Sequence, residues 1–115
     1  MNEKQVVNRI SKIFTKNNRQ YFNIKGDAFG NKAGTPDFLT MDINGRFVGL
    51  EIKAPSGKPY PNQLRRGREI LESGGRYVVA YPDFSIEDLD NETIPKVTFV
   101  DEEMTISKTT TEIIL

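Results

Sequence analysis

Three side chains in the middle of the chain could together perform metal-assisted chemistry: Asp37 of a Pro-Asp pair, then Glu51 and Lys53 in a Glu-x-Lys run. Two carboxylates can hold a hard divalent cation such as Mg²⁺ or Mn²⁺, and the backbone carbonyl of Ile52 is expected to be a further ligand. Such a cation lowers the pKa of a bound water and offsets charge that develops during displacement at phosphorus. The neighbouring ammonium group can orient that water or stabilise the transition state.

The composition narrows the chemistry further. The 115 residues include no cysteine and no histidine, which excludes thiol nucleophiles, disulfides, zinc clusters and imidazole bases. Any acid–base or metal chemistry must therefore use carboxylates, Lys, Tyr or bound water. A chain of this length is expected to form a single domain, residues 1–115, that needs no covalent staple.

A β-hairpin must bring these side chains together. Residues 37–43 and 46–54 are strand-like runs separated by Asn44-Gly45, which is the strongest short-range hairpin signal. Successive side chains on a strand point to opposite faces, so Glu51 and Lys53 share one face and Ile52 points into the core. A Glu-x-Lys run alone is weak evidence, because a solvated strand face often shows the same alternation.

The register of this hairpin gives a sharper test. A two-residue loop would pair residue 43 with residue 46, and would place Asp37 opposite Ile52 on the wrong face of the sheet. If Asp37 and Glu51 hold one metal ion, the loop must have three or five residues, or a bulge must lie near Gly45 or Gly49.

The remaining elements complete a mixed sheet flanked by helices. Apolar residues at helical spacing predict a helix over 3–16, a strand follows at 20–25, and residues 26–36 form a loop. Residues 62–73 are predicted to be a helix with Asn62 as its N-cap and Gly74-Gly75 as its end. Residues 76–81 then form a central strand. The order helix, strand, strand, strand, helix, strand predicts an α/β fold (an α+β mixed sheet).

The segment after Pro82 has weaker signals. It is predicted to contain one helical turn at 85–89 and short strands at 96–100 and 104–108. The net charge of zero hides an asymmetry: residues 1–81 carry +7 and residues 82–115 carry −7. A basic core at 3–81 with an acidic C-terminal extension at 82–115 is compatible with binding a polyanion, or with chance variation of solvated faces.

The motifs GTPDFL and LEIKAPSGKPYPNQ, in this order of elements, resemble the VRR-NUC branch of the PD-(D/E)xK nuclease superfamily, particularly its short stand-alone phage and bacterial members. The resemblance covers residues 3 to about 81 and implies a restriction-endonuclease-like core. It implies an active site made of Glu3, Asp37, Glu51, Lys53 and Gln63. Glu3 could instead be a first-turn acid that favours the helix dipole, and Gln63 a polar residue at a helix start.

The family resemblance implies an Mg²⁺- or Mn²⁺-dependent endonuclease that forms homodimers and cuts branched DNA such as four-way (Holliday) junctions. Phosphate contacts are expected from basic residues near the centre: Lys25, Lys32, Lys58, Arg65, Arg66 and Arg68. Tyr60 could stack on a base or serve in packing.

Two other classes of function remain open. One is a catalytically silent DNA-binding module, and the other is a domain that binds a protein partner through its acidic tail and apolar C-terminus. No nucleotide cofactor is expected. The chain has no long apolar run and no signal-peptide pattern at its start, so a cytoplasmic location in a bacterial or phage-infected cell is expected.

Overall fold

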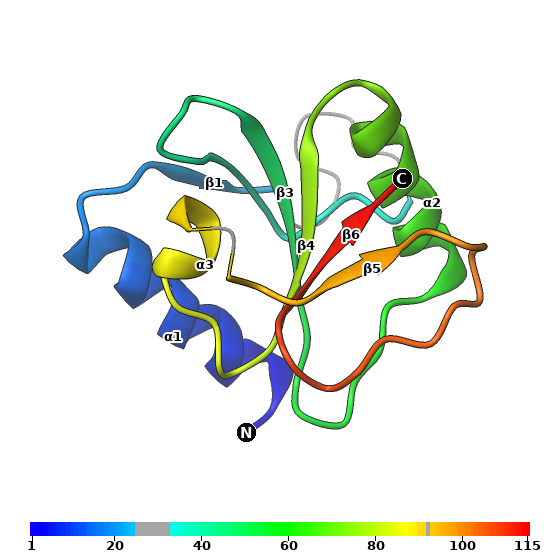
Figure 1. The fold of residues 1–115 in the computed structure, drawn as a ribbon. Coiled ribbons are helices and arrows are strands. Elements are labelled where there is room, and N and C mark those ends of the chain that lie inside the picture. Colours follow the sequence, from blue (N-terminus) through cyan, green and yellow to red (C-terminus); the bar gives the residue numbers. More distant parts are fainter. Residues whose placement is uncertain (25–32, 92) are drawn as a thin grey trace.

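The fold is a six-stranded mixed sheet covered by helices on both faces (Figure 1). The computed structural model describes residues 1–24, 33–91 and 93–115. Its elements are α1 (Glu3–Lys16), β1 (Tyr21–Asn23), β2 (Phe38–Met41), β3 (Phe47–Ile52), α2 (Pro61–Glu72), β4 (Arg76–Ala80), α3 (Glu87–Asp90), β5 (Lys96–Thr98) and β6 (Thr111–Ile114). The predicted α/β class, the mixed sheet and the order of elements up to β4 are confirmed.

The strand order is β1-β2-β3-β4-β6-β5, with β3 parallel to β4, β5 parallel to β6, and the other neighbours antiparallel. One apolar cluster lies between the sheet and α1 with α3, and a second lies between the sheet and α2 (Figure 1). Each face of β3 and β4 is therefore covered by a helix, which explains why β4 is buried along its whole length.

The C-terminal segment enters the sheet instead of extending from it. Strand β6 lies between β4 and β5, and Ile113 is fully buried there. The predicted strand at 104–108 is wrong, because this stretch is irregular and the place beside β4 is taken by Thr111–Ile114. The apolar C-terminus is thus a packed last strand, and the strand predicted at 96–100 is confirmed as β5 at Lys96–Thr98.

Three acids of this segment pair with bases of the core. Asp90, Glu102 and Glu112 form ion pairs with Arg19, Arg65 and Arg76, respectively. The charge asymmetry of the sequence is therefore reduced in space, since the two halves of the chain are packed against each other.

Helix α2 differs from its prediction at the start. The predicted N-cap, Asn62, is wrong: the N-cap is Tyr60 and the helix begins at Pro61. Proline is favoured at the first helical position, because its fixed φ suits the helix and its missing N–H would have had no intrahelical partner. Inside α2, a Cβ added at Gly67 would lie 2.4 Å from the ring of Tyr77, so this glycine lets the helix pack directly on β4.

The hairpin between β2 and β3 has the odd-numbered loop that a shared carboxylate site requires. Met41 pairs with Phe47, and the N–H of Asp42 donates to the carbonyl of Arg46 at 2.9 Å. Three residues, 43–45, therefore form the loop, and Gly45 adopts a positive φ of 79°. Of the alternatives predicted, a loop of three or five residues or a bulge near Gly45 or Gly49, the structure has the three-residue loop.

A buried ion-pair network holds this loop in place. One carboxylate oxygen of Asp42 accepts the backbone N–H groups of Asn44 and Arg46, each at 2.9 Å, and the other lies 3.1 Å from the guanidinium of Arg76. Arg76 also binds Glu112 of β6 at 2.8 and 2.9 Å. The network therefore joins the hairpin loop to β4 and β6.

We predict that Asp42→Asn costs ~2 kcal/mol of unfolding free energy at pH 7, since the charge-assisted bond to Arg76 is lost. Burial raises the pKa of Asp42, but hydrogen bonds from Arg46 and Arg76 outweigh it and leave the pKa below its ordinary value. Its stabilising effect is thus complete above the unfolded pKa and disappears as the pH falls through the folded one. Urea titrations should show wild type and variant converging below about pH 4.

Asp101→Asn is the matched control for this test. Asp101 also accepts a backbone N–H in a turn, from Glu103 at 2.8 Å, but it is exposed. An Asp42→Asn protein as stable at pH 7 as this control would contradict the structural role of the network.

Candidate active site

The hairpin register places two carboxylates side by side on the face of the sheet that α2 covers. Phe38 pairs with Leu50, so the next position along the ladder sets Asp37 opposite Glu51. Both side chains are buried, with 8% of Asp37 and 1% of Glu51 exposed. The alternative reading, a solvated strand face at residues 51–53, is therefore wrong.

Asp37 is fixed by the backbone of the facing strand. Its Oδ2 atom accepts the N–H of Ile52 at 2.8 Å. The N–H and C=O of one residue in an extended strand point to the same side, so the Ile52 carbonyl is also directed toward Asp37. The Ile52 side chain lies on the other face, in the cluster under α1. The three metal ligands predicted from the sequence are thus adjacent.

Lys53 joins this pair to the first helix. Its Nζ atom lies 3.8 Å from Oε2 of Glu51 and 3.7 Å from Oε1 of Glu3. Glu3 is the first residue of α1, and a reciprocal capping box between Asn2 and Gln5 fixes that helix end. The structure therefore brings together Glu3, Asp37, Glu51 and Lys53, which come from three separate segments of the chain.

The site holds two buried carboxyl groups and a single lysine ammonium. Burial raises the pKa of Glu51 well above its ordinary value, and the charge of Asp37 raises it further, while Lys53 offsets only part of the shift. Oε1 of Glu51 is buried and has no hydrogen-bond partner within the described residues. A buried oxygen of this kind normally has a partner, so it is suited to bind a cation or a proton.

Helix α2 forms the wall of the site through its first turn. A Cβ added at Gly34, whose φ is 85°, would lie 2.2 Å from the backbone oxygen of Asn62, so the chain entering Asp37 packs directly on this turn. Gln63 lies in the same turn, and its side-chain oxygen accepts the N–H of Tyr60 at 2.8 Å. Gln63 is thus on the same side of the sheet as the carboxylates.

Sequence reasoning missed two residues that support the site. Tyr77 is fully buried beneath α2 and donates from its hydroxyl to the Gln63 carbonyl at 3.3 Å. Burial, and then the charges of Glu51 and Asp37, raise the pKa of its phenol. Lys108 donates to the carbonyls of Ser56 and Gly57 at 2.9 and 3.0 Å, and so anchors the loop after Lys53. A glycine inside the predicted helix, Gly67, was a usable signal for close packing at Tyr77, whereas no local pattern marked Lys108.

The basic residues predicted to contact phosphate are only partly described. Lys25 and Lys32 lie outside the described residues, and Lys58 is exposed beside the site. Arg65 pairs with Glu102, Arg66 with Glu69 and Arg68 with Glu72. The three arginines therefore point in different directions on α2.

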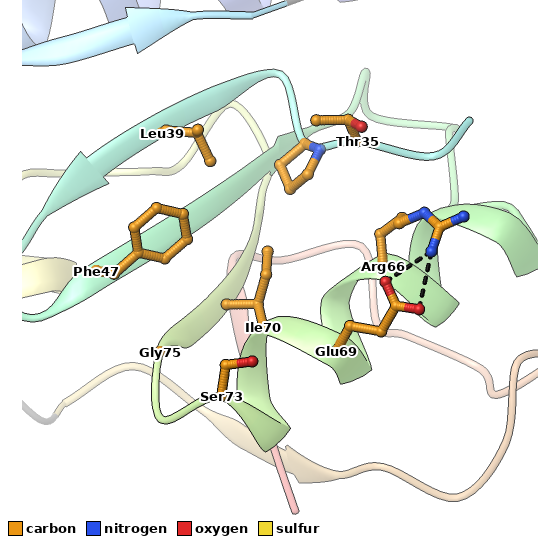
Figure 2. A pocket seen from close by; sticks show the side chains of 9 residues that line it. Thr35, Leu39, Phe47, Arg66, Glu69, Ile70, Ser73 and Gly75 are labelled. Atoms are coloured by element: carbon orange, nitrogen blue, oxygen red, sulfur yellow. Dashed lines mark hydrogen bonds and ion pairs between the residues drawn. The ribbon is translucent and has the colours of Figure 1, made fainter. Parts of the chain in front are cut away.

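An apolar groove lies between the hairpin and α2, beside Pro36. Its volume is about 470 Å³. Figure 2 shows Leu39 and Phe47 of the hairpin facing Ile70 of α2 across it, with the Arg66–Glu69 ion pair at one end. Asp37 and Glu51 do not line this groove, so it is distinct from the candidate centre.

Two further findings concern the described part of the chain. Within residues 1–24, 33–91 and 93–115, no three Asp, Glu, His or Cys side chains gather as a metal-binding cluster. None of the helices in these ranges is long and apolar enough to span a membrane.

The chain is similar to a protein of Acyrthosiphon pisum secondary endosymbiont phage 1 that bears the name "Putative nuclease p44". The two are 38% identical over 48 residues, a stretch that covers 42% of this chain and 52% of the phage protein. The match therefore spans about half the length of that relative. No protein family model matches the chain, and no solved structure matches it.

We predict that Glu51→Gln stabilises the protein at pH 8 in chelator-treated buffer by on the order of 1 kcal/mol, as removal of a functional-site strain often does. The raised pKa means that the folded state holds the Glu51 proton more tightly than the unfolded state does. Wild type therefore loses stability as the pH rises from the ordinary carboxyl pKa through the raised one. The difference should shrink at pH 4–5 in urea titrations.

Glu103→Gln, at an exposed position, serves as the control and should change little. If the Glu51→Gln protein is less stable than wild type at pH 8, the prediction is wrong, because the ionised Glu51 carboxylate then stabilises the folded state.

Proposed function

We propose that this chain is a metal-dependent DNA endonuclease with a PD-(D/E)xK active site of the VRR-NUC type. The observation that carries the proposal is the buried pair of carboxylates, Asp37 opposite Glu51, with the Lys53 ammonium 3.8 Å from Glu51. One Glu51 oxygen has no hydrogen-bond partner among the residues that the structure describes. The similarity to a phage protein named as a nuclease supports the same class of activity.

The donor set fits Mg²⁺ or Mn²⁺. Magnesium in phosphoryl-transfer sites is commonly held by one or two carboxylates, with the remaining ligands from water and substrate phosphate. Asp37, Glu51 and the Ile52 carbonyl would supply the protein ligands. When bound, the cation supplies Lewis-acid stabilisation and lowers the pKa of a water molecule.

The side chains have distinct tasks in this proposal. The Ile52 N–H holds the Asp37 carboxylate in one orientation. Lys53 carries a positive charge next to the site of reaction, where it would stabilise negative charge developing on the phosphate. Glu3 lies 3.7 Å from Lys53 and would orient its ammonium group. Gln63 lies on the adjoining turn of α2 and would complete the site.

Lys53→Ala should abolish cleavage, with a loss of at least about 10²-fold, because electrostatic stabilisation of the transition state is removed. The assay incubates labelled four-way junction, flap, single-stranded and duplex DNA with Mg²⁺, Mn²⁺ or chelator. Lys12→Ala, at an exposed lysine of α1, is the matched control and should cut at the wild-type rate.

The outcomes separate the three classes of function. Metal-dependent cutting that requires Lys53 would support the nuclease. Faster cutting of four-way junctions than of linear duplex would support branched DNA as the substrate. Binding without cutting in either metal would refute the catalytic proposal and leave a silent DNA-binding module. Neither binding nor cutting would favour a protein partner.

We further propose that the chain forms a homodimer through the sheet face beside the apolar groove. Ladder pairs set Phe22 opposite Leu39 and Met41 opposite Phe47, on the face that α2 leaves open at β1 and β2. Phe22 is 65% exposed and Met41 54%. Clustered exposed apolar side chains commonly mark an interaction surface.

The dimer proposal predicts that Phe22→Glu together with Met41→Glu shifts the protein from dimer to monomer in light scattering, because charges would be buried at the interface. Val100→Glu, at a position that is 74% exposed on another part of the surface, should remain dimeric. A wild-type protein that stays monomeric at about 100 µM, where an association free energy of roughly −5 kcal/mol would already produce dimers, would refute this surface.

A further inference from the structure

An exposed aromatic ring lies at the entrance to the candidate active site. Tyr60 is 63% exposed, and its ring centroid lies 5.0 Å from Nζ of Lys53. One face of the ring is thus directed toward the catalytic lysine, while the rest is open to solvent. A ring that is open to solvent beside a charged site offers an apolar face on which a planar group of a ligand can pack.

The backbone holds this ring in a defined position. Tyr60 is the N-cap of α2, and Pro61 fixes the first helical residue. Its N–H donates to the Gln63 side chain at 2.8 Å, and the N–H groups of Gln63 and Leu64 donate to its carbonyl at 2.9 and 3.0 Å. Pro59, on the other side, is buried. The ring therefore extends from an ordered helix start.

We propose that Tyr60 is a substrate-contacting residue on which an unstacked nucleobase packs, next to the phosphate that is cut. This inference rests on the proposed nuclease function and specifies which nucleotides the site accepts. Base–aromatic stacking contributes about 1–3 kcal/mol per base and does not depend on base identity. Lys58, two residues before Tyr60, is exposed and provides a positive charge for the phosphates of the bound DNA strand.

A stacking role for Tyr60 would make the protein prefer DNA that contains an unpaired base over continuous duplex. Within a continuous duplex, neighbouring bases cover both faces of each base, so none is available to Tyr60. At a flap, a branch or a strand end, an unpaired base has a free face. Tyr60 would therefore favour substrates with an unstacked nucleotide beside the scissile phosphate, independently of sequence.

A purely structural role for the ring would have a different signature. Contact with the Lys53 ammonium could hold that lysine in place by a cation–π interaction. In that case, loss of the ring would slow cleavage of every substrate equally and would leave the affinity for a flap unchanged. Affinity measured without turnover therefore separates the two roles.

The experiment uses DNA with 2-aminopurine at the unpaired position of a flap, and a continuous duplex of the same sequence. Wild type, Tyr60→Phe and Tyr60→Leu are titrated with Ca²⁺ in place of Mg²⁺, and gels confirm that the DNA stays intact. Phe keeps the ring, whereas Leu keeps the apolar character without it. At an exposed position both variants should fold.

We expect wild type and Tyr60→Phe to bind the flap equally and to quench the 2-aminopurine fluorescence. Tyr60→Leu should bind the flap about tenfold more weakly, lose the quenching, and bind the duplex as wild type does. Equal flap affinity and quenching for the Phe and Leu proteins would overturn the inference.

The outcome for Tyr60 is separable from that for the nuclease. Ring-dependent flap binding by a protein that fails to cut in Mg²⁺ or Mn²⁺ would keep the stacking residue and remove the catalytic proposal. If the protein cuts DNA and neither the Phe nor the Leu substitution at Tyr60 changes that cutting, the nuclease proposal stands and the stacking role of Tyr60 is refuted.

Discussion

The register of the β2–β3 hairpin is the constraint on which the candidate site depends. Because side chains alternate along a strand, adding or removing one loop residue would turn Asp37 to the face opposite Glu51. Asp42 stabilises the three-residue loop, because its carboxylate accepts the N–H groups of Asn44 and Arg46 and binds Arg76. Arg76 in turn binds Glu112 of the last strand. The ion-pair network at the loop end of the hairpin thus stabilises the register. That register places Asp37 and Glu51 on the same face at the other end of the two strands.

The second constraint is the burial of like charges. The fold places Asp37 and Glu51 together under α2 and leaves one Glu51 oxygen with no partner in the described residues. Such an arrangement opposes folding and favours whatever cation or proton binds there, which is the usual relation between stability and function at a polar site. Close packing around the site offsets this cost in folding free energy. Tyr77 packs under Gly67, Gly34 packs against the first turn of α2, and two apolar clusters lie on the two faces of the sheet.

Much of this arrangement could be predicted because it depends on local patterns. Alternation and an Asn-Gly turn gave the hairpin, and the requirement that Asp37 meet Glu51 gave the odd loop. The helix start at Pro61 had a local signal, proline at the first helical position, which the choice of Asn62 as N-cap overlooked. The irregular stretch at 104–108 and the insertion of β6 beside β4 could not be predicted, since both depend on contacts between distant segments. The same holds for Lys108, which supports the site from 51 residues beyond Gly57.

The central claim, that Asp37 and Glu51 form one cation site, is tested most directly by Mn²⁺ binding measured with electron paramagnetic resonance. Wild type is titrated beside Asp37→Asn, Glu51→Gln and the exposed control Glu103→Gln at pH 8. The account predicts that wild type and control bind Mn²⁺ with the same affinity, and that each carboxylate substitution weakens binding at least about tenfold, or more than 1.4 kcal/mol. Equal binding by all four proteins would contradict it.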